Sequence, residues 1–111
     1  MNAQDFANKL LDEIEVVSQA QRFLEEKTKQ DYSTYSKALK YISQYLTHLW
    51  DLYYYYLNQG MMEVSYQLEN SLNDLKNFND QINREVQTLQ QINKMITLIS
   101  EILMFAFGLK H

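Results

Sequence analysis

The sequence predicts an all-α protein, an antiparallel helical bundle built as one domain over residues 1–111. Two observations lead to this class. The 111 residues contain only two glycines and no proline, so residues that end helices or favour turns are scarce. Apolar residues also recur at intervals of three, four and seven along much of the chain, the pattern of helices that pack along their length. We expect three helices, the last of them long, with a four-helix bundle as the alternative.

The first predicted helix begins close to Asn2, whose side chain can accept a hydrogen bond from the first turn. Asp5 adds a negative charge where the helix dipole favours one. Apolar residues then keep the helical spacing as far as Leu24. A polar segment over residues 25–31 follows, and either Asp31 or Ser33 could cap the next helix.

The second predicted helix, over residues 34–58, has two apolar seams side by side, so it should contact more than one neighbour and form the centre of the bundle. Eight of the nine tyrosines lie within residues 32–56, and four are consecutive at 53–56. Because successive residues turn by about 100°, four adjacent side chains cannot all face one core. We expect one or two of them to be exposed, either with only their hydroxyls in water or as anchors of a protein interface.

The clearest helix stop in the sequence is Asn58-Gln59-Gly60, where the glycine suits the left-handed conformation that closes helices. A connection this short predicts that the second helix and the segment after it are antiparallel neighbours.

The segment over residues 61–107 carries the most regular apolar pattern, with an interval of seven. The repeat consists of Met61, Leu68, Leu75, Ile82, Leu89, Ile96 and Leu103. Asparagine and aspartate crowd the middle of the segment, and these poor helix formers allow a break near residues 77–80. The phase of the repeat nevertheless passes through this region unchanged, which favours one continuous helix.

The two alternatives differ in the assembly that they predict. A continuous helix of 47 residues would be about 70 Å long, against about 40 Å for each of the first two helices. The overhanging apolar stripe would then need a second chain, most simply a two-fold dimer. A break would instead give a compact four-helix bundle that could be monomeric.

A second apolar stripe runs beside the repeat over residues 95–109. It consists of Met95, Leu98, Ile102, Phe105 and Leu109. This stripe could be the best-buried end of the bundle, a groove for a partner, or a lipid-facing surface. The lipid interpretation is the weakest of the three, because interfacial helices usually carry more lysine and arginine.

The composition excludes several kinds of chemistry. The chain has no cysteine, hence no thiolate nucleophile, disulfide or cysteine-bound metal. Its net charge is −4 and it has no basic stripe, which argues against nucleic acid as a partner. Asp12, Glu13 and Glu15 lie on different sides of the first helix and should be solvated. The interior histidine, His48, is not part of a Glu-x-x-His pair, so we predict no catalytic residue, metal site or cofactor.

These observations favour a non-enzymatic helical module for protein–protein interaction, such as an adaptor, chaperone or assembly factor. A protein partner or self-association, most simply a dimer, is expected. The alternative is a peripheral membrane-associated protein that uses residues 95–109. The sequence has neither a signal peptide nor an apolar run long enough to span a bilayer, so a cytoplasmic location is expected. The predicted contact residues are Trp50, Tyr53, Tyr54, Met95, Leu98, Ile102 and Phe105.

Overall fold

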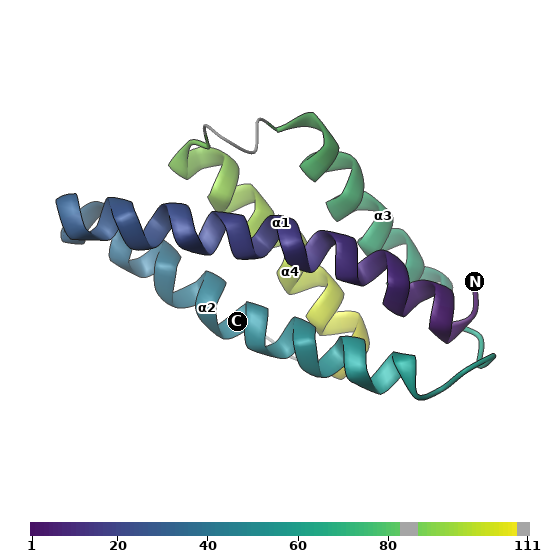
Figure 1. Cartoon of the computed structure of the whole chain (residues 1–111). Coiled ribbons are helices and arrows are strands. Elements are labelled where there is room, and N and C mark those ends of the chain that lie inside the picture. The colour runs from purple at the N-terminus through teal and green to yellow at the C-terminus, as the bar shows by residue number, and fades with distance from the viewer. Residues whose placement is uncertain (83–86, 109–111) are drawn as a thin grey trace.

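A computed structural model describes residues 1–82 and 87–108, and in these residues the regular secondary structure is entirely α-helical apart from one isolated β-bridge. Four helices follow one another along the chain (Figure 1). They are α1 (Ala3–Gln30), α2 (Tyr32–Leu57), α3 (Tyr66–Gln81) and α4 (Leu89–Phe107). The predicted all-α helical bundle is confirmed.

The caps expected from the sequence begin α1 and α2. The Asn2 side chain accepts a hydrogen bond from the Asp5 backbone N–H at 2.9 Å, and Asp31 accepts one from the Thr34 N–H at 3.2 Å. Asp31 is also the only residue between the two helices. The polar segment over residues 25–31, where the end of the first helix was not predicted, is therefore helical as far as Gln30. Gly60 has a positive φ of 61°, as predicted for the turn after α2.

The chain does not fold straight back onto α2 after this turn, so the prediction that the next segment is an antiparallel neighbour of α2 is wrong. Residues 60–64 pass the N-terminal end of α1, where Glu63 forms an isolated antiparallel bridge with Asn2. The Ala3 N–H donates to the Met62 carbonyl at 2.7 Å, and the Val64 N–H donates to the Met1 carbonyl at 3.0 Å. This crossing directs α3 onto α1 and α4 instead.

The segment over residues 61–107 is two helices rather than one, so the continuous helix is wrong and the four-helix alternative is right. The break also lies later than residues 77–80, because α3 continues to Gln81. Ile82 is extended, and α4 begins with a capping box. In it, the Gln91 N–H donates to the Thr88 hydroxyl at 3.1 Å and the Thr88 N–H donates to the Gln91 side chain at 3.0 Å. These two bonds satisfy backbone donors that a helix start leaves unpaired.

The break removes the physical basis of the predicted dimer. With 16 residues in α3 and 19 in α4, the two helices extend only about 24 and 29 Å at 1.5 Å per residue. Neither helix is therefore longer than α1 or α2. Within residues 1–82 and 87–108, neither α3 nor α4 extends an apolar stripe beyond the length of α1 and α2, so self-association would need another surface.

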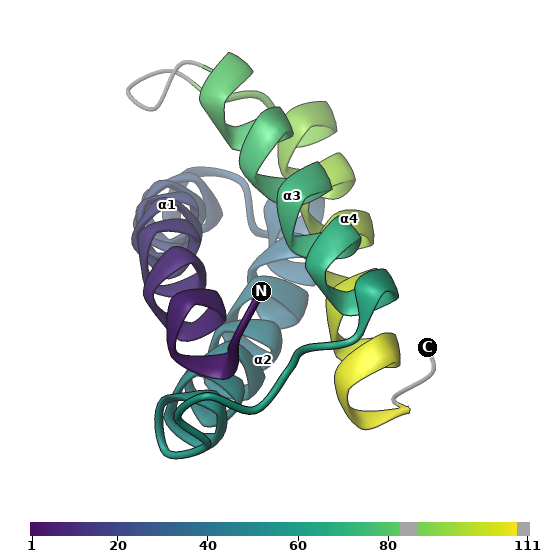
Figure 2. The ribbon, with the colours of Figure 1, turned by 90° about the vertical axis from the view of Figure 1, so that its right-hand side faces the viewer.

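The helices form two hairpins that share one hydrophobic core. Figure 2 shows α1 beside α2 and α3 beside α4, and contacts between α2 and α4 and between α1 and α3 join the two pairs. The core includes Phe6, Ile42, Leu49, Leu72 and Ile99, each 1% exposed or less. All four helices thus contribute to the same interior.

Replacing Thr88 by alanine tests the four-helix arrangement. Loss of the capping box should lower the free energy of unfolding by about 1 kcal/mol. In a continuous helix the same change would instead raise it by up to about 0.7 kcal/mol, because alanine is the better helix former. Thr97→Ala, an exposed site inside α4, is the matched control and should show that small gain. Urea denaturation of the three proteins measures both effects, and a stabilised Thr88→Ala variant would contradict the break.

Candidate interaction surface

The run of four tyrosines in α2 divides between the core and the surface. Tyr56 packs against Phe6 of α1, with ring centroids 4.9 Å apart, and burial raises the pKa of the Tyr56 hydroxyl. Tyr53 packs against the hydrophobic core. Tyr54 and Tyr55 are 56% and 51% exposed. The prediction that one or two of these side chains are exposed is confirmed.

Three aromatic side chains of α2, Trp50, Tyr53 and Tyr54, form an aromatic cluster. The Trp50 ring meets Tyr53 edge-on at 5.8 Å and stacks on Tyr54 at 6.0 Å, between ring centroids. The Tyr53 and Tyr54 rings are 5.2 Å apart. Each ring is therefore in contact with the other two, although Trp50 is 37% exposed and Tyr54 is 56% exposed. The cluster is a packed apolar surface that remains open to water.

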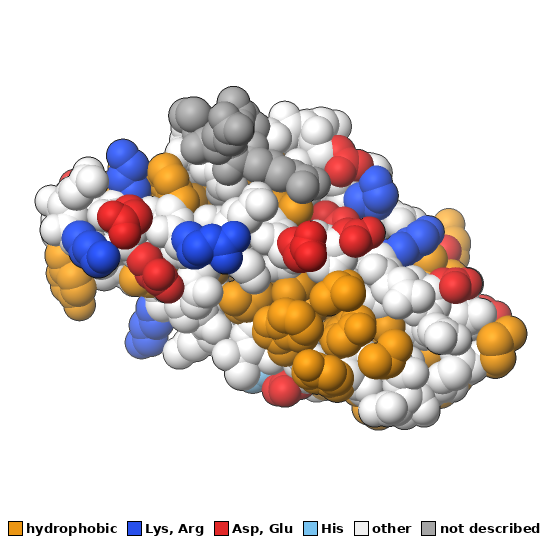
Figure 3. All heavy atoms as spheres, in the orientation of Figure 1, with side chains coloured by type: hydrophobic (Ala, Val, Ile, Leu, Met, Phe, Trp, Pro, Cys, Tyr) orange, Lys and Arg blue, Asp and Glu red, His pale blue; other side chains and the backbone are white. Residues whose placement is uncertain are grey.

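The aromatic cluster lies on the flank of α2 that faces α1. The Gln21 side-chain amide of α1 donates a hydrogen bond to the Ser43 hydroxyl at 3.1 Å, so Ser43 lies on this flank. Trp50 follows Ser43 by seven residues, or about two helical turns, and so points in nearly the same direction. Figure 3 shows hydrophobic side chains gathered over α2, below a row of charged side chains along α1.

The predicted contact residues of α4 fall into two groups. Met95 and Ile102 are fully buried in the core, so in this fold neither forms part of a surface. Leu98 is partly buried, and Phe105 is 44% exposed. Exposed Met104 and Phe107 accompany Phe105 near the end of α4. The predicted stripe over residues 95–109 is thus largely core, and its last member, Leu109, lies outside the described residues.

Glu13 is a buried carboxyl group, so the prediction that it is solvated is wrong, whereas Asp12 and Glu15 are exposed. Glu13 is 4% exposed and accepts a hydrogen bond of 3.1 Å from the Asn79 side chain of α3. Burial raises the pKa of the Glu13 carboxyl, and the nearby Asp80 and Asp12 carboxylates raise it further. The Asn79 hydrogen bond and the Lys76 ammonium oppose this shift of the pKa.

Asn79 is completely buried, and its hydrogen bond to Glu13 uses only the amide nitrogen of its side chain. Its Oδ1 atom accepts no hydrogen bond from any residue that the structure describes. Sequence reasoning missed this pair because Asn79 belongs to a run of polar residues that resembles a helix break. A buried polar pair with one unpaired oxygen joins the two hairpins at the cost of some stability.

The described residues contain no group of three His, Asp or Glu side chains close enough to hold a metal ion. Within the same residues, no helix has the length and apolar character needed to cross a bilayer. The candidate interaction site of this four-helix bundle is the aromatic cluster.

No protein-family model, no curated protein and no solved structure matches this chain.

Proposed function

We propose that this protein is a non-enzymatic module for protein–protein interaction, an adaptor, chaperone or assembly factor, whose contact surface is centred on the aromatic cluster. The observation that supports this function is the exposure of Trp50 and Tyr54 on a regular helix, at 37% and 56%. Tryptophan and tyrosine are the residues most enriched among those that dominate binding energy at protein interfaces. A packed group of them in contact with water is a candidate site for a partner.

The geometry of the cluster favours binding at low entropic cost. Each of the three rings is restrained by the other two, and Tyr53 also packs against the core. Side chains that are already ordered lose little rotamer freedom when a partner arrives. The partner is a second copy of this chain or another protein, and Phe105 and Leu98 on α4 are further candidate contacts.

A double substitution, Trp50→Ala with Tyr54→Ala, should weaken binding at least tenfold, because such anchors typically contribute about 2 kcal/mol or more each. Sedimentation over a range of concentrations measures self-association. Capture from an extract of the cells that make the protein measures binding to other proteins. Tyr66→Ala is the matched control, since Tyr66 is 78% exposed but lies on α3. Circular dichroism checks that each variant is folded.

The proposal is contradicted if neither method detects an association that depends on Trp50 and Tyr54. Flotation with phosphatidylcholine and phosphatidylserine vesicles tests the alternative, a membrane-associated protein. The buried positions of Met95 and Ile102 reduce the surface available to lipid to the end of α4. Flotation that is lost in a Phe105→Ser, Phe107→Ser variant and retained in the Trp50, Tyr54 variant would support a membrane surface instead.

A further inference from the structure

The open rings of the aromatic cluster suit a positively charged ligand. Aromatic faces carry negative electrostatic potential, and lysine or arginine binds over them within about 6 Å of the ring centroid. In this protein, Lys27 Nζ lies 5.6 Å from the Phe23 ring centroid. Lys94 Nζ likewise lies 5.9 Å from the Phe78 ring centroid. Among the described residues, no lysine or arginine makes such a contact with the aromatic cluster, so its rings are available to a cation from another molecule.

A free carboxylate, that of Asp51, lies beside the cluster. Asp51 is the only aspartate, glutamate, lysine or arginine in α2 after Lys40, which is about 16 Å away along the helix. The Asp51 side chain is exposed and forms no ion pair with any residue that the structure describes. It precedes Tyr54 by three residues, so the two side chains are neighbours on the surface of α2. A cation on the open face of Tyr54 is therefore within reach of a carboxylate.

The surface around the aromatic cluster is acidic. Contacts of α1 with Tyr56 and with Ser43 place residues 7–20 of α1 beside residues 44–55 of α2, which contain the cluster. The acidic residues of these two segments are Asp12, Glu13, Glu15 and Asp51, and the only lysine or arginine is Lys9. All of these acids except Glu13 are exposed, and Figure 3 shows acidic side chains on α1 above the hydrophobic side chains of α2. The electrostatic field over the cluster therefore attracts cations.

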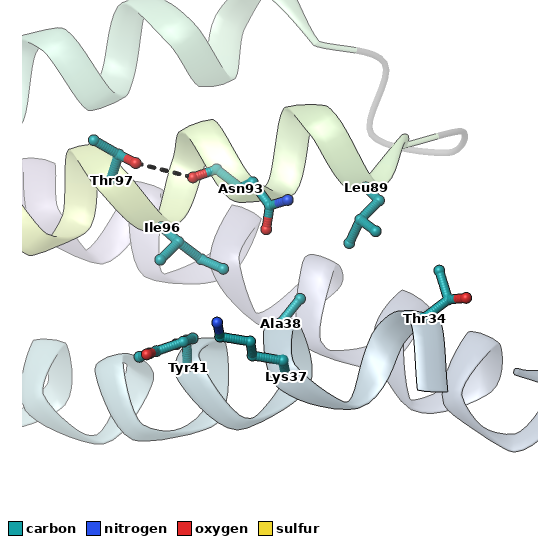
Figure 4. A pocket seen from close by; sticks show the side chains of 8 residues that line it. All are labelled: Thr34, Lys37, Ala38, Tyr41, Leu89, Asn93, Ile96 and Thr97. Carbon is teal, nitrogen blue, oxygen red and sulfur yellow. Dashed lines mark hydrogen bonds between the residues drawn. The ribbon is translucent and has the colours of Figure 1, made fainter. Parts of the chain in front are cut away.

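The basic residues of α2, Lys37 and Lys40, lie in its first half, and no lysine or arginine occurs in residues 41–75. Figure 4 shows Lys37 with Tyr41 beside a hollow between α2 and α4. Tyr41 precedes Trp50 by nine residues, or two and a half turns, so this hollow is on the opposite side of α2 from the cluster. α2 therefore supplies no cation to its own aromatic cluster.

We propose that the aromatic cluster binds an arginine-bearing segment of a partner protein. The guanidinium group lies over the open face of the Tyr54 ring, and its charge pairs with the Asp51 carboxylate. Arginine fits this surface better than lysine, because the planar guanidinium stacks on aromatic rings and is more weakly hydrated than an ammonium group. The inference rests on the proposed function and defines the chemistry of the partner at that same surface.

Fluorescence of Trp50 reports binding at this site directly, because Trp50 is the only tryptophan of the chain. Short random peptides displayed on phage are selected on the folded protein, together with overlapping segments of this chain. We expect enrichment of peptides that contain arginine. The dissociation constants of the enriched peptides, measured from the change in tryptophan emission, should increase at least tenfold when the arginine is replaced by citrulline. Citrulline keeps the planar shape of arginine and removes its charge, so the comparison isolates the cation.

Substitutions in the protein test the two groups that hold the cation. Asp51→Asn removes the carboxylate, and Tyr54→Leu keeps an apolar side chain but removes the ring. Each should increase the dissociation constants of the arginine peptides at least threefold. Asp74→Asn and Tyr66→Leu, at exposed sites of α3, are the matched controls and should change these constants less than twofold. Circular dichroism checks that each variant is folded.

Four results would overturn the assignment of an arginine-bearing partner. They are failure to enrich any peptide, enrichment of peptides without arginine, binding that citrulline does not weaken, and binding that is unchanged in Asp51→Asn or in Tyr54→Leu. Enrichment of a segment of this chain would overturn it in favour of a second copy. The proposed function would survive each of these results if association with a partner is still lost in the Trp50→Ala, Tyr54→Ala variant, so the two failures are distinguishable.

Discussion

Replacing Ile102 by alanine should lower the free energy of unfolding by about 2–5 kcal/mol, the range for large aliphatic residues truncated in a core. Ile102 is fully buried on α4, so its truncation leaves a cavity that the two hairpins can close only in part. A loss of this size is a large fraction of the stability of a small domain. Denaturation by urea, monitored by circular dichroism, measures it.

The matched control is Phe105→Ala, on the same helix and in the same predicted stripe. Phe105 is 44% exposed, and its truncation should cost no more than about 1 kcal/mol, as for surface sites that lose part of a contact. Similar losses for the two variants would mean that α4 does not present Ile102 to the core and Phe105 to water.

Glu13→Gln should raise the free energy of unfolding at pH 7 by about 1–3 kcal/mol, the cost of a buried polar group without a partner. A glutamine amide can accept from Asn79 Nδ2 as Glu13 does, and can also donate to Asn79 Oδ1, which is unpaired in the described structure. The substitution also removes the cost of keeping a buried carboxylate charged. Glu15→Gln, at an exposed site two residues along α1, is the control and should change stability by less than about 0.5 kcal/mol.

The same carboxyl group makes stability depend on pH. Burial raises the pKa of Glu13 in the native state above its ordinary value of 4.5. The native state therefore holds this proton more tightly than the unfolded chain does, and the free energy of unfolding falls as pH rises from about 4.5 through the native pKa. The stabilisation from the protonated group is complete below that window and is lost above it.

The Glu13→Gln variant has no such group, so the difference in stability between it and the natural protein should be larger at pH 7 than at pH 4.5. Urea denaturation at both pH values measures this difference and cancels the contribution of the other carboxylates. A difference that is the same at both pH values would show that Glu13 titrates alike in the folded and unfolded states.

The helix ends were predictable wherever a side chain determines them locally. Asn2 and Asp31 cap α1 and α2 because each side chain reaches a backbone N–H three residues away. The division of the four tyrosines between core and surface follows from helical rotation alone. Such features depend only on residues that are close in the sequence, so they can be predicted without knowledge of the tertiary structure.

The number of helices was obscured by a coincidence of length. α3 ends at Gln81 and α4 begins at Leu89, so the connection has seven residues, the same as the repeat. The apolar residues on both sides therefore keep a common phase although the helix does not continue. The pairing of Thr88 with Gln91 is the local signal of a new helix start, because it has the spacing of a capping box.

The candidate site depends on packing between distant segments, which periodicity does not specify. Met95 and Phe105 belong to one stripe, yet one is buried and the other exposed because only part of that wide stripe faces the other three helices. Glu13 is likewise buried only because the crossing over residues 60–64 brings α3 and Asn79 onto α1. A pattern on one helix cannot show which neighbour will cover it.

The pairing of helices that are adjacent in the sequence also affects the rate at which the chain folds. Helices joined by a single residue, as α1 and α2 are at Asp31, can find each other with little loss of loop entropy. Proteins dominated by such local contacts fold within microseconds to milliseconds. The union of the two hairpins, which brings Glu13 to Asn79 across 66 positions of the chain, is the slower closure and should limit the rate.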